Sequence, residues 1–152
     1  AQVVNGNKKT INEIKRYILN TDLENEIILP NYISKEEAHT YYKNALMYVF
    51  PSIDEGFGIP IIEAFSYCLP IICSDIPVFK EIGNNSVSYF KKGDFISLSE
   101  KIQNLINSEH LRKEFSQKGK TQLIKFSRKN FIRGFEDLII HWNEKQKNIN
   151  SS

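Results

Sequence analysis

Cysteine and histidine are scarce in this sequence, with two cysteines and three histidines among 152 residues. Two thiols cannot build a disulfide framework, and the spacing of Cys68 and Cys73 matches no zinc motif. No Asp-x-Asp metal motif occurs either. We therefore predict incidental or buried thiols, no metal, no cofactor and a reducing compartment.

Long apolar runs and a strong net charge are also missing. The formal net charge is +2, too small to indicate nucleic acid or an anionic membrane as a partner. No apolar run approaches the roughly 18 residues that span a bilayer. The first residues, "AQVVNGNKK", lack the pattern of a secretory signal. These absences predict a mature, soluble chain with no nucleic-acid partner.

What is present is typical of a globular protein. The chain is 41% hydrophobic and 25% charged, and its length suffices for one buried core. It shows no internal repeat and no low-complexity linker. We therefore expect a single domain over residues 1–146, followed by a polar tail, residues 147–152, that frays.

The first half alternates strand-like and helix-like segments. The predicted strands are Val3–Val4, Glu26–Pro30, Leu46–Phe50, Leu69–Ser74 and Ser86–Phe90. Helices are predicted between them, opening at Thr10, at Ser34 and near Pro60. Thr10 and Ser34 are each followed three residues later by a glutamate, as in a capping box. Strands separated by helices predict an α/β fold, a Rossmann-like parallel sheet with helices on both faces.

The second half, from Asp94 onward, is predicted to be a helical carboxyl-terminal region. Its second helix is expected to break or bend near Gly119, and Ser127 can cap a third helix. The apolar stripe of that third helix is typical of a core, and any part of it left exposed would favour self-association. The stripe consists of Phe131, Phe135, Leu138, Ile139 and Trp142.

The segment after the Leu46–Phe50 strand has the features of a ligand-binding turn. In open parallel sheets, ligands bind outside the carboxyl ends of the strands. Gly56 and Gly58 allow the backbone to approach a ligand closely. Pro60 suits the first position of a helix, whose free N–H groups and positive dipole end favour a diphosphate.

Two glutamates flank this turn. Glu55 precedes it and Glu63 lies about one helical turn beyond it. A carboxylate only accepts hydrogen bonds, so vicinal hydroxyls of a sugar or ribose are its natural uncharged partners. This layout suggests a nucleotide sugar. Alternatively, Glu55 is a solvated loop residue and Glu63 merely favours the helix N-terminus, and the spacing alone does not choose between these interpretations.

The stretch "PSIDEGFGIPIIEAF" resembles the E-x7-E segment of retaining GT-B glycosyltransferases, the group-1 or family-4 type. Flanking pieces agree in order and spacing, and the resemblance spans Val3–Trp142. These pieces are "NYISKEEAHTYYKNALMYVFPS" before the motif, and "LPIICSDIPVFKEI" and "GDFISLSEKI" after it.

The resemblance implies roles for individual residues. Glu55 matches the first glutamate, the catalytic and hexose-binding residue, and Glu63 matches the ribose-binding one. Backbone amides of Gly56, Phe57, Gly58 and Ile59 would face the sugar and diphosphate. The loop of Asn31, Tyr32 and Ile33 would bracket the base.

The resemblance also implies partners and a reaction. A hexose would move with retention from a nucleoside-diphosphate sugar to a hydroxyl of a glycan or lipid-linked acceptor, in polysaccharide or glycoconjugate assembly. Such an enzyme would be cytoplasmic, with the full-length form allowed a peripheral place at the inner face of the membrane.

This sequence departs from the family pattern in three ways. Cys68 stands where relatives often have glycine, which weakens the prediction of a left-handed turn there. An earlier strand with its basic residues and the acceptor-binding amino-terminal half are missing. We therefore expect the carboxyl-terminal part of a longer enzyme, a GT-B C-terminal half lacking its first strand and inactive alone.

Three alternatives remain. A phospho-acceptor receiver domain could use Asp54, but no acidic pair follows the first predicted strand. A GT-B sugar-nucleotide epimerase would share the binding turn without transferring sugar. A non-catalytic sugar-nucleotide-binding subunit would bind the donor and do no chemistry.

Overall fold

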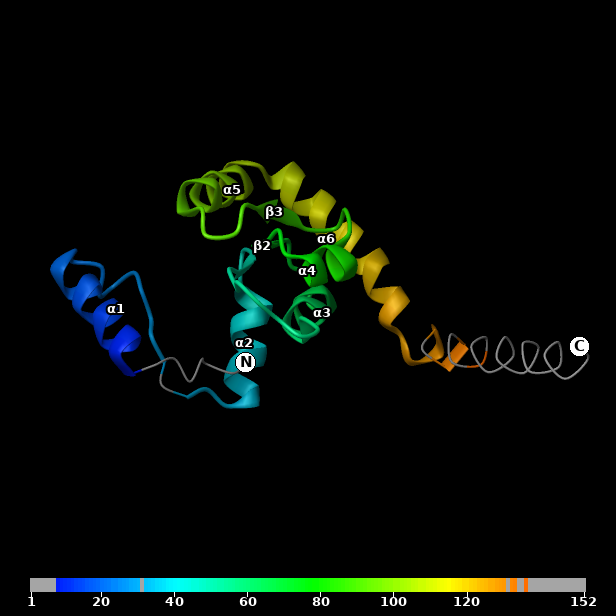
Figure 1. Ribbon diagram of the computed structural model, residues 1–152, viewed down its shortest axis with the longest axis horizontal. Helices are drawn as coiled ribbons and strands as arrows, with labels where there is room; N and C mark the ends of the chain where they lie inside the picture. Colours follow the sequence, from blue (N-terminus) through cyan, green and yellow to red (C-terminus); the bar gives the residue numbers. More distant parts are fainter. Residues whose placement is uncertain (1–7, 31, 131, 134–135, 137–152) are drawn as a thin grey trace, which may run out of the picture. The chain divides into compact units, whose positions relative to one another are not determined.

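The computed structural model describes residues 8–30, 32–130, 132, 133 and 136. The chain forms two compact units, Ala1–Asn44 and Ala45–Ser152, and Figure 1 labels their α-helices and the strands β2 and β3. Several features predicted from the sequence lie outside the described residues: the Val3–Val4 strand, Asn31, the apolar stripe of the last helix and the tail 147–152.

The first unit contains α1 (Lys8–Asn20) and α2 (Lys35–Asn44). Thr10 lies inside α1, so the prediction that it caps this helix is wrong. The capping box of α2 is confirmed. The Ser34 hydroxyl accepts a hydrogen bond from the Glu37 N–H at 3.1 Å, and the Glu37 carboxylate accepts one from the Ser34 N–H at 2.7 Å. Two backbone donors that the helix leaves open are thereby satisfied.

The predicted strand Glu26–Pro30 is wrong. The segment starts with a turn, in which the N–H groups of Glu26 and Ile27 both donate to the Leu23 carbonyl at 3.0 Å. Ile28 is 71% exposed, and none of these residues belongs to the described sheet. An apolar run becomes a strand only when a neighbour pairs with it and covers a face, which is why strand propensity depends on context.

The second unit is built on a three-stranded parallel sheet of order β1-β2-β3. The strands are β1 (Tyr48–Phe50), β2 (Ile71–Ser74) and β3 (Ser88–Phe90), and they fall within three of the predicted segments. Helix α3 (Ile59–Ser66) connects β1 to β2, and α4 (Pro77–Gly83) connects β2 to β3. The predicted α/β fold with a parallel sheet is confirmed.

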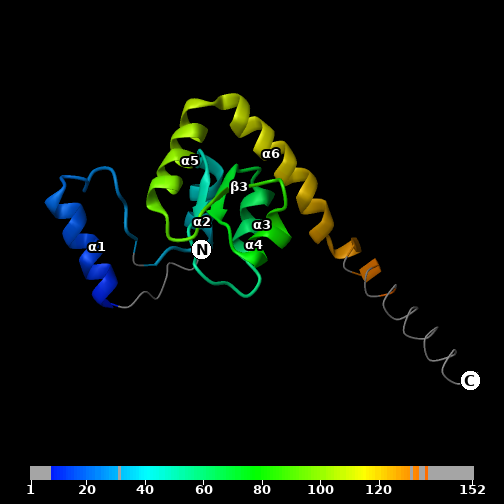
Figure 2. The ribbon, with the colours of Figure 1, turned by 45° about the horizontal axis from the view of Figure 1, so that its top comes forward.

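Helices cover both faces of this sheet, as Figure 2 shows for the second unit. Side chains alternate between faces along a strand. On one face, Ile72 and Phe90 form a buried cluster with Leu105 of α5 (Phe95–Asn107). On the other face, the Phe50 ring lies 5.0 Å from the Phe79 ring of α4, measured between centroids.

Helix α6 (Glu109–Leu123) continues through Gly119 into a short 3-10 turn, Ile124–Phe126. The predicted break near Gly119 is therefore wrong. A Cβ at this position would lie 2.5 Å from Cδ1 of Phe65. The glycine allows α6 to approach α3 closely, and it does not interrupt the helix.

The end of α3 corrects the expectation about Cys68. Cys68 adopts a left-handed conformation with φ of 56° although it is not glycine. Its N–H donates to the Phe65 carbonyl at 2.9 Å, and the Leu69 N–H donates to the Ala64 carbonyl at 3.2 Å. These two bonds form a Schellman motif, which satisfies carbonyls that the helix end would leave open.

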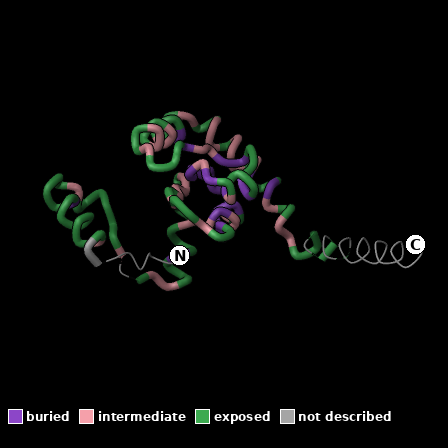
Figure 3. The backbone as a smooth tube through the Cα atoms, viewed as in Figure 1, coloured by how far each residue is buried: buried purple, intermediate pink, exposed green. Residues whose placement is uncertain are grey.

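Burial is concentrated in the sheet and in the helices that flank it, drawn purple in Figure 3. All four residues of β2 are buried, as expected for the central strand of a parallel sheet. Ser127 caps the helical residues that follow it, accepting a hydrogen bond from the Asn130 N–H at 3.4 Å, as predicted. Among the described helices, none is long and apolar enough to cross a membrane.

Candidate functional site

The carboxyl ends of the three strands define the candidate site. Because the strands are parallel, the segments after Phe50, Ser74 and Phe90 emerge at one edge of the sheet. This edge is where open α/β sheets bind ligands. The loop 51–58, which contains four of the predicted site residues, Glu55, Gly56, Phe57 and Gly58, is one of these segments.

Glu55 is held within this loop by Ser52. The Ser52 hydroxyl lies 3.0 Å from the Glu55 carboxylate and 3.0 Å from the Asp54 carbonyl oxygen. Glu55 is half-buried. A carboxylate that accepts one hydroxyl hydrogen bond retains further lone pairs for a ligand.

Gly58 makes the turn from this loop into α3. It is the N-cap of α3 with φ of 76° and ψ of 38°, a left-handed conformation. A Cβ on Gly58 would lie 3.1 Å from the Phe79 ring and 3.3 Å from the Ile82 side chain. The left-handed conformation therefore favours glycine here, and a Cβ would in addition crowd the Phe79 ring.

Gly56 differs from Gly58. A Cβ on Gly56 would meet no atom within 4 Å, so packing does not require this glycine. Gly56 thus borders open space, and it lies in the loop that the sequence predicts to bind a ligand. Phe57, the residue between the two glycines, is 54% exposed.

The N-terminus of α3 has no side-chain cap. The helix begins at Ile59, one residue earlier than predicted, so Pro60 is its second residue. Helix N-termini present free N–H groups and a positive partial charge, which favour anions. In this helix no capping side chain competes with such an anion.

Glu63 lies on the exposed side of α3. Ile59, Glu63 and Ser66 are exposed, whereas Ile61 and Ala64 are buried. Positions separated by four and three residues share one face of a helix. The exposure of this face alone accounts for a polar residue at position 63, and a role towards ribose is an additional hypothesis.

Tyr32 and Ile33 belong to the first unit. Tyr32 is 85% exposed and Ile33 is half-buried. The other predicted site residues, Glu55–Ile59 and Glu63, all belong to the second unit and lie along a single loop-helix segment.

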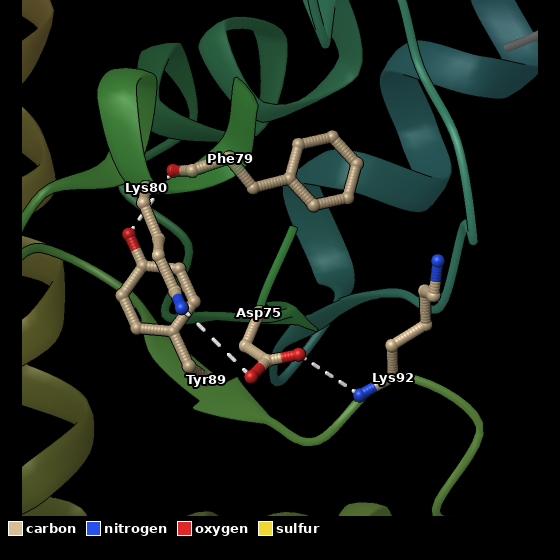
Figure 4. A network of polar contacts seen from close by, with 5 residues as sticks. All are labelled: Asp75, Phe79, Lys80, Tyr89 and Lys92. Carbon is tan, nitrogen blue, oxygen red and sulfur yellow. Dashed lines mark hydrogen bonds and ion pairs between the residues drawn. The ribbon is translucent and has the colours of Figure 1, made fainter. Parts of the chain in front are cut away.

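A polar network that the sequence analysis missed joins the strand ends. Asp75 follows β2, and its carboxylate accepts a hydrogen bond from the Lys92 N–H at 3.0 Å (Figure 4). The Lys80 ammonium lies 3.8 Å from the same carboxylate. The hydrogen bond from Lys92, together with the positive charge of Lys80, lowers the pKa of Asp75 below its ordinary value.

The same region contains a second, more buried contact. The Tyr89 hydroxyl donates to the Phe79 carbonyl at 3.0 Å, also drawn in Figure 4. Burial raises the pKa of Tyr89. The signal that could have revealed the network is positional: an acidic residue follows one predicted strand directly, and two lysines follow the next.

The two cysteines differ in accessibility. Cys73 is buried in β2, and burial raises its pKa to about 12. Cys68 is exposed. Within the described part of the chain, no group of three or more histidine, cysteine or acidic side chains could hold a metal ion.

The chain belongs to the family of glycosyl transferases group 1, whose family model matches residues 2–122. It is 37% identical over 92 residues to the O-antigen chain mannosyltransferase RfbU of Salmonella typhimurium, covering 60% of this chain and 26% of that protein. It is 31% identical over 125 residues to the capsular polysaccharide biosynthesis glycosyltransferase CapM of Staphylococcus aureus, covering 80% and 32%. The chain thus spans about a quarter to a third of these relatives.

Solved structures show the same fold. A sucrose-phosphate synthase from Thermosynechococcus elongatus aligns with a TM-score of 0.72 at 20% identity, over 88% of this chain and 34% of that one. The C-terminal domain of a group 1 family glycosyl transferase (LpcC) from Francisella tularensis aligns with a TM-score of 0.69 at 22% identity, over 77% and 62%. The architecture is that of a GT-B C-terminal domain, as predicted.

Proposed function

We propose that the chain is the donor-binding half of a retaining glycosyltransferase. The transferred group is a hexose, the donor a nucleoside-diphosphate sugar, and the acceptor a hydroxyl of a growing glycan or lipid-linked glycan. Support comes from membership of the family and from relatives named for O-antigen and capsular polysaccharide synthesis. The observation that carries the proposal is the start of α3, which has a left-handed glycine N-cap and no capping side chain.

The diphosphate of the donor is placed against the N-terminus of α3. Backbone amides of Gly56, Phe57, Gly58 and Ile59 face the sugar and the diphosphate. Positive helix-end charge stabilises the leaving diphosphate, and fixed donors do so without reorganising during the reaction. The protein lowers the barrier by positioning and by electrostatics.

The two glutamates bind hydroxyls at opposite ends of the donor. Glu55, the proposed catalytic residue, accepts hydrogen bonds from the transferred hexose. The Ser52 hydroxyl holds the Glu55 carboxylate in place. Glu63, exposed on α3, accepts from the ribose. Tyr32 and Ile33 bracket the base.

The acceptor is placed in a part of the enzyme beyond these residues, with residues 1–146 forming the donor-binding domain. The chain alone then binds the donor weakly and transfers no sugar. Its place of action is the cytoplasm, where nucleotide sugars would be supplied, with the full-length enzyme at the inner face of the membrane.

Titration of a panel of nucleotide sugars against the chain tests the binding proposal. Glu55→Gln and Glu63→Gln each remove one charged hydrogen-bond acceptor, and each should lower the affinity for the donor about tenfold or more. Glu81→Gln is the matched control, because Glu81 is exposed on α4 rather than on the donor segment. Equal affinities for all three variants would contradict the roles of Glu55 and Glu63.

Product analysis with the full-length protein tests the reaction. We expect an α-configured donor to give an α-linked glycosylated acceptor, and residues 1–152 alone to give none. A donor converted to its epimer without glycosylation would identify the epimerase alternative, and binding without any turnover would identify a non-catalytic subunit. Transfer by the isolated chain would disprove its proposed inactivity.

A further inference from the structure

The segments that follow all three strands are connected by one lysine. The Lys92 N–H, after β3, donates to the Asp75 carboxylate, after β2, at 3.0 Å. The Lys92 ammonium donates to the Ile53 carbonyl, after β1, at 3.4 Å. The main chain and the side chain of Lys92 thus contact two different neighbouring segments.

The main chain and the side chain of Asp75 are both held in place. Its N–H donates to the Phe90 carbonyl at 2.9 Å, and its carboxylate lies 3.8 Å from the Lys80 ammonium. In Figure 4 the ammonium end of Lys92 points away from Asp75. The Asp75 carboxylate therefore fixes the Lys92 backbone and leaves the lysine charge available to the β1–α3 loop.

The loop contact of Lys92 lies next to the Glu55 support. Ile53, whose carbonyl accepts from Lys92, directly follows Ser52, whose hydroxyl lies 3.0 Å from the Glu55 carboxylate. The Ile53 side chain is 67% exposed, so apolar packing contributes little to holding this part of the loop. Polar contacts that Ser52 and Lys92 make with residues 53–55 restrain this part of the loop.

We propose that Lys92 is a positioning residue for the donor site, holding the loop 51–58 so that Glu55 is placed for the sugar before the donor arrives. The inference rests on the proposed function for its consequence in donor binding. Its structural part, that Lys92 orders the loop, can be measured without any ligand. Preorganisation raises affinity because the loop loses less conformational freedom on binding.

Backbone amide order parameters of the ligand-free chain, from NMR relaxation, test the structural part. Lys92→Met removes the ammonium and keeps most of the apolar side chain, and it should lower the order parameters of residues 53–57 from about 0.85, the value of a rigid backbone, towards about 0.6. Lys91→Met is the matched control, because Lys91 is an exposed neighbour with the same charge. Lys92→Arg, which keeps a charged donor, should restore the order of the loop. Unchanged order parameters in Lys92→Met, or equal effects of Lys91→Met and Lys92→Met, would overturn the proposal.

Donor affinity tests the consequence. With the nucleotide sugar that binds best in the panel, Lys92→Met should weaken binding about three- to tenfold, and Lys91→Met should do so less. In the Ser52→Ala background, Lys92→Met should cost less than in the wild type, because both residues act through the same loop. Additive losses would contradict the shared action.

The two proposals fail in distinguishable ways. If no nucleotide sugar binds the wild-type chain while Lys92→Met still lowers the order parameters of the loop, the proposed donor-binding function fails and the positioning by Lys92 stands. If donors bind and depend on Glu55 but Lys92→Met changes neither the order parameters nor the affinity, the positioning by Lys92 fails and the proposed function stands.

Discussion

Gly119 of α6 lies directly against the ring of Phe65 of α3, where a Cβ would come within 2.5 Å of the Phe65 Cδ1 atom. Phe65 is fully buried and cannot easily move away. The absence of a side chain at Gly119 therefore allows α6 to pack this closely against α3.

Gly119→Ala should destabilise the second unit. Overpacking a core costs about 1–3 kcal/mol, and alanine returns about 1 kcal/mol through its better helix propensity, so we expect a net loss of about 1 kcal/mol. Urea denaturation measures this change. Lys120→Ala, at the next and exposed position of α6, serves as the control and should stay close to the wild type. A more stable Gly119→Ala variant would show that α3 and α6 are not packed as described.

Cys68→Gly should stabilise the protein. Cys68 has φ of 56°, a left-handed conformation that is unfavourable by about 1–2 kcal/mol for a residue with a Cβ. Glycine relieves this strain but has greater freedom in the unfolded chain, so a gain of about 0.5–1 kcal/mol remains. Cys68→Ala removes the thiol and keeps the Cβ, and it should give no gain in thermal denaturation. Equal behaviour of the two variants would argue against backbone strain.

Asp75→Asn should destabilise the fold near neutral pH, and the difference from the wild type should vanish in acid. The folded-state pKa of Asp75 lies below its ordinary value because of the Lys92 N–H and the Lys80 charge. A lowered pKa means that the contribution is complete above the unfolded pKa of about 3.9 and is lost as the pH falls through the folded pKa. Denaturant midpoints of both proteins, measured from neutral pH to below the ordinary aspartate pKa of about 3.9, report whether the difference shrinks as the pH falls. A constant difference at every pH would assign the effect to something other than the charge.

The two cysteines should differ sharply in reactivity. Thiolate is the reactive form, and burial raises the pKa of Cys73 to about 12, whereas Cys68 is exposed. A thiol reagent at neutral pH should modify Cys68 within the folded protein and Cys73 only after unfolding. In the Cys68→Ala variant, fast labelling of the native state should disappear. Rapid labelling of Cys73 in that variant would mean that β2 opens locally.

Local patterns predicted the strands of the second unit and one helix cap of the first unit. The runs that include β1, β2 and β3 were recognisable because each is a short apolar or β-branched segment bounded by turn residues. The capping box of Ser34 and Glu37 was recognisable because both partners are neighbours in the chain. The two glycines and Pro60 likewise indicated a turn before a helix, and the structure adds that Gly58 is the left-handed N-cap.

Non-local contacts account for the errors. The Glu26–Pro30 run has a strand-like composition, yet no strand of the described sheet pairs with it. Gly119 carries the ordinary signal of a helix break, and only the Phe65 ring gives it another role. Cys68 adopts a conformation that glycine favours because the hydrogen bonds at the end of α3 outweigh the strain at one residue.

Some features of the candidate site could likewise be recognised in the sequence, whereas others were found only in the structure. Glu55, Gly58 and Glu63 were recognised within a single segment, from its turn residues and from its resemblance to the E-x7-E segment of the family. The link from Asp75 to Lys92 joins residues that are 17 positions apart, and the link from Lys92 to Ile53 joins residues that are 39 positions apart.

Sequence alone determined which short segments could form strands, caps and a donor-rich turn, because hydrogen bonds and sterics between near neighbours decide these. Tertiary structure decided which segments pair, which glycine is needed for packing and which lysine reaches the loop, because parallel strand ends meet only after the intervening helices have packed.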